Sequence, residues 1–199
     1  MINARTRKMV EQHQVWVASS GQSGRQLVSE DLDFRGAELP DIELLNAEIP
    51  GADFSAASMA RTDLSGCNLA SAKFERADFS NAALVKSNLD YADFTAANLA
   101  GANLRRASLI EAVLTEADLD RADLRGADLS GADLRGASLA GSQLDDAFLD
   151  GTKLGGARLR GATGIETLRR CRIDVGASDA PDLREGEAAR KWLLDAAKA

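Results

Sequence analysis

Large apolar residues recur at every fifth position over most of the chain. The series runs from Phe34 to Leu159 without a phase break, which is 26 consecutive positions. A small residue, usually alanine, stands two positions before each of these centres, and the residue between them is commonly aspartate or asparagine. The two positions after each centre vary, although glycine is frequent at the second, as at Gly126 and Gly131.

A period of five fits neither an α-helix, at 3.6 residues per turn, nor a flat strand, at two. It predicts a coil that turns a corner every five residues, so that four sides close a coil of about twenty residues. Successive coils would stack at the strand spacing of about 4.8 Å, and each backbone group could pair with the coil above or below. The small residue and the centre point inward, the other three residues point outward, and glycine suits a corner that needs a positive φ.

The phenylalanines provide an internal check on a twenty-residue coil. Four of the six lie twenty residues apart and should stack on one side as a ladder: Phe34, Phe54, Phe74 and Phe94. Phe79 would lie on an adjacent side. Leu104 is a centre, so we expect Leu104→Asp to unfold the central coils by burying an unpaired carboxylate. Asp128 points outward, so we expect Asp128→Ala to have little effect.

This repeat resembles that of the pentapeptide-repeat family, whose consensus is a small residue, Asp or Asn, Leu and two variable residues. The resemblance covers about residues 32–162 and implies an all-β solenoid, a right-handed quadrilateral β-helix with short α-helical segments at both ends. The handedness comes from the resemblance alone. We expect three segments, which are an N-terminal helix and capping loop over 1–31, about 6.5 coils over 32–163, and an irregular last coil with a C-terminal helix over 164–199.

The two ends have the character of caps, which a solenoid needs to cover its core and strand edges. In the N-terminal segment, a helical spacing links Met9, His13 and Trp16 or Val17, before glycines interrupt it. The predicted C-terminal helix carries an apolar stripe: Trp192, Leu193 and Ala196. This stripe either covers the last coil of its own chain or packs on a second copy, as in several relatives, so the protein is a monomer or a C-terminal homodimer.

Charge and composition limit the classes of partner. The formal net charge is -7, and the repeat segment holds 21 acidic against 13 basic residues. That balance argues against direct nucleic-acid binding, which needs a basic footprint. Cys67 and Cys171 form no metal or disulfide pattern, and no apolar run approaches the ~18 residues of a membrane span. We expect a cytoplasmic protein.

No set of residues with catalytic spacing is present. The only histidine is His13, which falls on a predicted helix and cannot complete a Ser/His/Asp arrangement. The many carboxylates recur at outward repeat positions, which is typical of a solvated surface rather than of an acid–base pair. We therefore expect no enzyme, no cofactor and no metal.

Sorting the outward residues by register gives three candidate surfaces for a protein partner. A basic stripe follows one side: Arg105, Arg106 and Arg125, with Lys86 nearby. An acidic side carries Asp78, Asp118 and Asp120. An apolar strip occupies outward slots of a third side: Tyr91, Ile110 and Phe148. Each surface is either ordinary solvated surface or part of a binding site.

Two functional hypotheses follow. The first is a non-enzymatic interaction or structural module whose unidentified protein partner contacts the apolar strip. The second is implied by the family resemblance: a DNA-mimicking binder of bacterial DNA gyrase or another topoisomerase, giving quinolone or gyrase-poison resistance. The physical basis of mimicry is that regularly spaced carboxylates can occupy a basic groove built for phosphates. A continuous acidic side and a dimerising C-terminal helix would distinguish this second hypothesis from the first.

Overall fold

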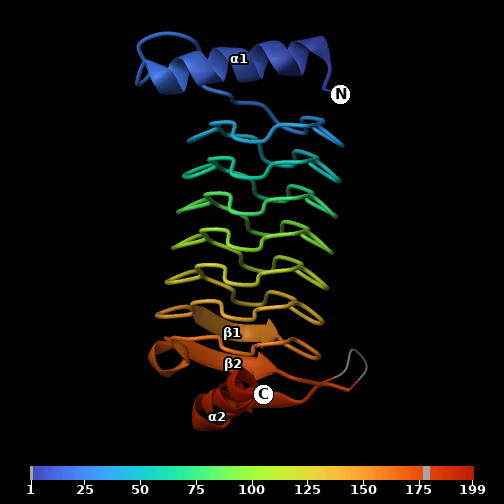
Figure 1. Ribbon diagram of the computed structural model, residues 1–199, viewed down its shortest axis with the longest axis vertical. Coiled ribbons are helices and arrows are strands. Elements are labelled where there is room, and N and C mark those ends of the chain that lie inside the picture. Colours follow the sequence, from blue (N-terminus) through green and yellow to red (C-terminus); the bar gives the residue numbers. More distant parts are fainter. Residues whose placement is uncertain (1, 177–179) are drawn as a thin grey trace.

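The chain forms a straight stack of coils with a helix at each end (Figure 1). The computed structural model describes residues 2–176 and 180–199, so positions 1 and 177–179 of the expected terminal segments lie outside the described residues. The elements in chain order are α1 (Ala4–Ala18), β1 (Phe148–Lys153), the 3-10 helix η1 (Ile165–Thr167), β2 (Arg170–Asp174), β3 (Leu183–Glu185) and α2 (Gly186–Lys198).

Parallel β-bridges twenty residues apart join each coil to the next. They begin with Val28–Glu48 and continue to Gln143–Thr163, four for every twenty residues. The Leu104 N–H donates to the carbonyl of Asp123 at 2.8 Å in the coil below. Each side makes a single bridge before the chain turns, so most of the ladder consists of isolated bridges rather than extended strands. The fold is a repeat β-helix.

The centres and the small residues fill the interior of the stack. Ala102 and Leu104, for example, are fully buried. The expected phenylalanine ladder is present, with ring centroids 4.5, 5.4 and 4.4 Å apart along Phe34, Phe54, Phe74 and Phe94. Phe79 meets Phe74 edge-on at 5.1 Å. Stacked and edge-on rings are both favourable arrangements, so this part of the core is specified by side-chain shape as well as by apolarity.

Every described corner of the repeat places its second residue after the centre in the left-handed region. Gly126 has φ +67°, but non-glycine residues adopt the same geometry, with φ +56° at Arg106 and at Ala96. A side chain in this region costs roughly 1–2 kcal/mol relative to ordinary helical or extended backbone. The stack therefore imposes the corner, and glycine relieves the strain without being required.

Aspartate and asparagine before the centre have a structural role that the sequence pattern did not reveal. Their side-chain oxygen accepts a hydrogen bond from the backbone N–H two residues later, as between Asp128 and Ser130 at 3.0 Å. This Asx turn bends the chain toward the corner. Asp128 is partly buried, so the expectation that Asp128→Ala has little effect is revised.

Helix α1 lies across the N-terminal end of the stack (Figure 1). It begins after Asn3, whose side chain accepts from the Thr6 N–H at 2.8 Å. Its buried face contains Thr6, Val10 and His13. The expected stripe is therefore displaced, because Met9 and Trp16 are only partly covered. His13 is fully buried, and its Nδ1 accepts the Leu27 N–H at 2.9 Å, which ties the helix to the first coil.

At the C-terminal end, β2 continues the stack by pairing parallel with β1, and β3 pairs antiparallel with β2. Helix α2 covers this sheet (Figure 1). Leu193 is fully buried, while Trp192 and Ala196 are partly buried against the core. The Gly161 N–H donates to the carbonyl of Ala197 at 2.7 Å. Within the described residues, no helix is long and apolar enough to cross a membrane.

Candidate functional site

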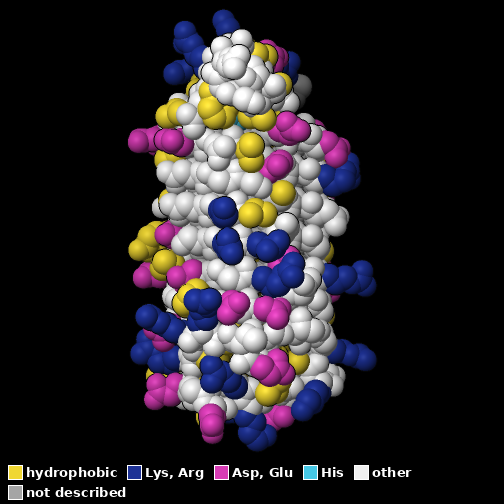
Figure 2. Space-filling view, turned by 90° about the vertical axis from the view of Figure 1, so that its left-hand side faces the viewer, with side chains coloured by type: hydrophobic (Ala, Val, Ile, Leu, Met, Phe, Trp, Pro, Cys, Tyr) yellow, Lys and Arg dark blue, Asp and Glu magenta, His cyan; other side chains and the backbone are white. Residues whose placement is uncertain are grey.

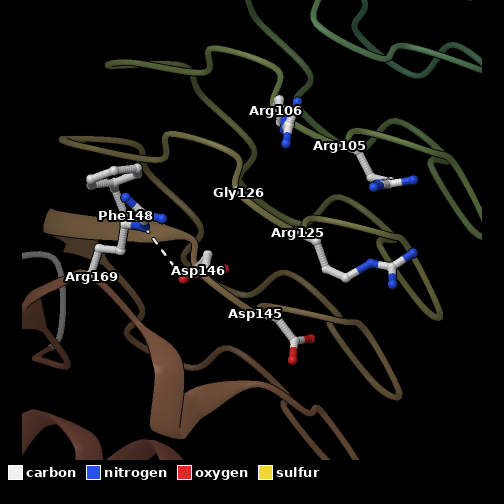
Figure 3. Close-up of a pocket in the computed structure, with 8 residues that line it drawn as sticks. All are labelled: Arg105, Arg106, Arg125, Gly126, Asp145, Asp146, Phe148 and Arg169. Atoms are coloured by element: carbon white, nitrogen blue, oxygen red, sulfur yellow. Dashed lines mark hydrogen bonds and ion pairs between the residues drawn. The ribbon is translucent and has the colours of Figure 1, made fainter.

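A groove of about 360 Å³ follows one edge of the rod. Eight residues line it: Arg105, Arg106, Arg125, Gly126, Asp145, Asp146, Phe148 and Arg169. They come from three successive coils and from the segment before β2, so the coil stacking, rather than sequence proximity, brings them together. Figure 3 shows Arg105, Arg125 and Asp145 on one side, with Arg106, Phe148 and Arg169 on the other.

Gly126 lies in the middle of this edge, between Arg106 and Asp146 (Figure 3). It occupies the corner directly below Arg106, twenty residues later in the chain. A Cβ at Gly126 would come within 3.4 Å of the Arg106 Cγ. The stem of Arg106 therefore lies beside the Gly126 backbone, where a side chain would otherwise stand.

The arginines differ in how far their charge is already neutralised. Arg125 holds Asp123 with two hydrogen bonds, Nε to Oδ1 at 2.8 Å and Nη2 to Oδ2 at 2.6 Å. Burial acts to raise the pKa of Asp123, but the bonds and charge of Arg125 outweigh it and lower the pKa. Arg105 reaches the same carboxylate only at 4.0 Å, and Arg106 has no ion pair within the described residues. Arg105 and Arg106 are thus the cations available to a partner.

The other end of the groove is acidic and partly apolar. Arg169 pairs with Asp146 at 3.3 Å, and its guanidinium lies 5.8 Å from the centroid of the Phe148 ring. Asp145 makes no ion pair with any residue the structure describes, because Arg125 pairs with Asp123 and Arg169 with Asp146. The groove therefore has its least paired cations, Arg105 and Arg106, toward the N-terminal end, and its two carboxylates, one of them paired with Arg169, toward the C-terminal end. Figure 2 shows a face of the rod where Lys and Arg side chains gather at mid-height above Asp and Glu side chains.

The predicted apolar strip is divided in the structure. Tyr91 is 58% exposed, and its N–H donates to the carbonyl of Ile110 at 2.9 Å, so these two residues are neighbours. Phe148 bridges Asp128, which in turn bridges Ser108, so it lies two coils beyond. Phe148 instead joins the basic stripe across a corner of the rod.

The predicted acidic side is not continuous. Asp78 and Asp118 alternate along their column with Asn98 and Ser138. Asp78 accepts from the Asn98 amide at 2.9 Å. Asp118 accepts from the N–H of Asp120 at 2.9 Å. These carboxylates stabilise the coils, and their spacing is twice that of the stack.

Asp120 is also used internally. Its Oδ1 accepts a hydrogen bond from the Ser138 hydroxyl and another from the Ala140 N–H at 3.1 Å. All three acidic candidates thus accept hydrogen bonds from the coil itself.

Four groove residues were not predicted: Gly126, Asp145, Asp146 and Arg169. The first three carry a signal in the sequence, because they follow Arg106 or Arg125 at intervals of twenty residues. Arg169 lies beyond the periodic segment and carries none. The groove crosses a corner of the rod, so its residues belong to two sides of the coil and share no single position in the repeat.

The sequence model described as Pentapeptide repeats (8 copies) matches residues 30–66, 50–84, 87–126 and 122–161. A comparison with curated protein sequences gives no match. Among solved structures, the chain is similar to a trypsin-treated variant of QnrB1, a plasmid-mediated fluoroquinolone resistance protein, with 17% identity, a TM-score of 0.62 and 83% of each chain covered. A second such variant has 21% identity and a TM-score of 0.58, over 69% of this chain and 76% of that one.

HetL, a pentapeptide repeat protein involved in heterocyst differentiation regulation in Nostoc sp. strain PCC 7120, has 26% identity over 75% of this chain and 91% of its own, with a TM-score of 0.35. The two QnrB1 likenesses show a shared fold and no more. The family match covers more than half of the chain and coincides with the bridged coils. The chain belongs to the pentapeptide-repeat family.

Proposed function

We propose that the protein is a non-enzymatic interaction module that binds a protein partner through the groove between Arg105 and Asp146. The observation that carries this proposal is the pair of guanidinium groups of Arg105 and Arg106 in one hollow with Phe148. Arg105 reaches a carboxylate only at 4.0 Å, and Arg106 forms no ion pair with any described residue. Arginine and aromatic side chains are enriched in protein interfaces and among the residues that dominate binding energy.

The charge pattern of the groove favours a protein over a polynucleotide. A phosphate backbone presents only negative charge, and it would meet Asp145 and Asp146 at the acidic end. Two side chains that could be reactive, Cys67 and His13, are buried, and this supports the non-enzymatic part of the proposal. Burial raises the pKa of the Cys67 thiol to about 12, so its reactive thiolate is strongly disfavoured. His13 is enclosed beneath helix α1.

We also propose that the coil is four-sided and right-handed and that the protein is cytoplasmic. Four bridges for every twenty residues support a four-sided coil, and its right-handed sense is taken from the family resemblance. Cys67 and Cys171 are both free thiols, which supports a reducing compartment such as the cytoplasm.

Charge reversal at the groove tests the proposal. Tagged wild type and the variant Arg105→Glu/Arg106→Glu would each be incubated with an extract of the native cells, and the retained proteins quantified by mass spectrometry. A matched control, Arg76→Glu/Arg121→Glu, reverses two exposed arginines on other edges that form no ion pair with the described residues. We expect the groove variant to lose partners that the control retains. Identical retained proteins for all three would refute the groove as a binding site.

A second candidate function is binding of a topoisomerase. Its support is the fold shared with QnrB1 variants, whose parent is a fluoroquinolone resistance protein. The interrupted acidic side weighs against DNA mimicry. A gyrase supercoiling assay with added protein, at two salt concentrations and with a quinolone, tests it. Salt-sensitive inhibition or protection from the drug would favour this candidate, and no effect above stoichiometric protein would exclude it.

A further inference from the structure

We propose that the partner seated in the groove is a second copy of this chain, bound side by side and antiparallel about a two-fold axis at Gly126. This inference rests on the proposed function, that the groove is a protein interface. The charge pattern along the edge identifies the partner as a second copy.

The pattern is antisymmetric about Gly126. Residues twenty apart on this edge read positive, positive, neutral and negative: Lys86, Arg106, Gly126 and Asp146. The next coil is longer by two residues, since Phe148 pairs with Arg170, and the acidic residue that follows Asp146 along the edge is Glu166 in η1. The four charged residues are exposed. Glu166 lies in η1, and the Asp146 N–H donates to the Thr167 hydroxyl at 3.1 Å, which places η1 beside Asp146.

A two-fold axis perpendicular to the rod reverses the direction of one copy relative to the other. In a two-fold interface each residue contacts its counterpart reciprocally. An axis at Gly126 therefore brings Arg106 opposite Asp146 of the second copy, and this pair forms twice. Lys86 lies toward η1 of the second copy, which carries the exposed Glu166. The neighbouring column behaves in the same way, because Arg105 and Asp145 are equally spaced on either side of Arg125.

Two features reduce the repulsion that self-association would otherwise meet. Arg125 lies on the axis and would face its own counterpart, but it is already paired with Asp123 in each copy. The Arg169–Asp146 pair is 59% exposed on both sides, and an exposed ion pair contributes little to stability. Asp146 can therefore exchange Arg169 for Arg106 of the second copy at little cost.

The edge is long enough for a side-by-side contact over several coils. Five coil levels separated by about 4.8 Å give a contact some 19 Å long. Gly126 itself contributes no side chain on the axis. A uniformly acidic partner would be repelled by Asp145 and a uniformly basic one by Arg105 and Arg106, whereas a reversed copy brings opposite charges together at these positions.

Charge exchange between two copies provides the test. Arg106→Glu places two acidic groups opposite each other twice in a homodimer, and Asp146→Arg does the same with two basic groups. In a mixed dimer of the two variants, every one of these pairs is attractive. Sedimentation velocity would be measured from micromolar to millimolar concentrations for wild type, each variant and their equimolar mixture. Urea unfolding would verify that both variants keep wild-type stability, as expected for exposed residues.

We expect wild type to dimerise, each single variant to dimerise about tenfold more weakly, and the mixture to regain the wild-type dimer. A wild type that stays monomeric throughout overturns the inference, while the groove as a binding site for another protein is judged separately by the Arg105→Glu/Arg106→Glu capture experiment. A dimer that is unchanged in both single variants also overturns it. Loss of that dimer on Trp192→Ala would then assign it to helix α2.

Discussion

Arg106 and Asp146 are forty residues apart in the sequence and lie two coils apart on one edge of the rod, at opposite ends of the same groove. A stack of twenty-residue coils converts the sequence into columns, so that residues separated by multiples of twenty become neighbours along an edge. The surface chemistry of this protein therefore depends on how charges are distributed at intervals of twenty.

The corner geometry predicts opposite effects for the same substitution at two adjacent residues. Ala96 is exposed with φ +56°, whereas Ala97 is 1% exposed and faces the core. Ala96→Gly should stabilise by about 0.5–1 kcal/mol, because relief of left-handed strain exceeds the entropy cost of glycine. Ala97→Gly should destabilise by about 1–2 kcal/mol through lost burial and added chain entropy. Urea unfolding measures both, and effects of the same sign would contradict the assigned register.

The Asx turn predicts that Asp128 matters for stability. Asp128→Ala removes the acceptor of the Ser130 N–H and should cost about 1 kcal/mol, the usual net contribution of such a bond. Asp128→Asn keeps an oxygen at the same position and should lose much less. The comparison is made by thermal unfolding of the two variants beside wild type. Equal melting temperatures for alanine and asparagine would mean that the turn does not depend on the side-chain acceptor.

His13 predicts a loss of stability on mild acidification. Its burial disfavours the charged imidazolium and lowers the pKa, partly opposed by the backbone carbonyls of Leu44 and Leu45, neither of which completes a hydrogen bond with Nε2. In the unfolded chain the imidazole titrates near ~6.5. Between the two pKa values the unfolded state binds more protons, so the free energy of unfolding falls as pH drops below about 6.5 and levels off below the folded pKa.

The matched control for this prediction is His13→Asn, which keeps a side-chain acceptor for the Leu27 N–H and removes the titration. Urea unfolding between neutral pH and about pH 5 should show a decline for wild type and a flatter profile for the variant. Asp33 does not titrate in this pH range, because its hydrogen bonds to Arg35 lower its pKa to about 2. Parallel profiles for the two proteins would show that His13 is not the group responsible.

The repeat β-helix could be predicted from the sequence because a period of five fixes the direction of nearly every side chain. Leu104 and the phenylalanine ladder are buried where that period places them. The face of α1 was less well specified, since a 3.6-residue periodicity does not reveal which side meets the first coil. Val10 is therefore buried where Met9 was expected.

The candidate site could be predicted only in part. The basic stripe was visible as Arg105, Arg106 and Arg125, but Phe148 was grouped with Tyr91 because both occupy outward slots of one side. The groove crosses a corner, where the last residue of one side and the first residues of the next meet. Arg169 approaches from the irregular segment, and no periodicity locates a residue there.

The central claim is that the groove around Phe148, rather than another surface of the rod, is the protein interface. The most direct measurement places a photo-reactive phenylalanine analogue at Phe148 or, as the control, at Tyr91, an exposed aromatic residue outside the groove. After irradiation in native cell extract, we expect discrete adducts from the Phe148 position, including one at twice the 21.1 kDa chain mass. Adducts from Tyr91 alone, or equal labelling at both positions, would contradict the claim.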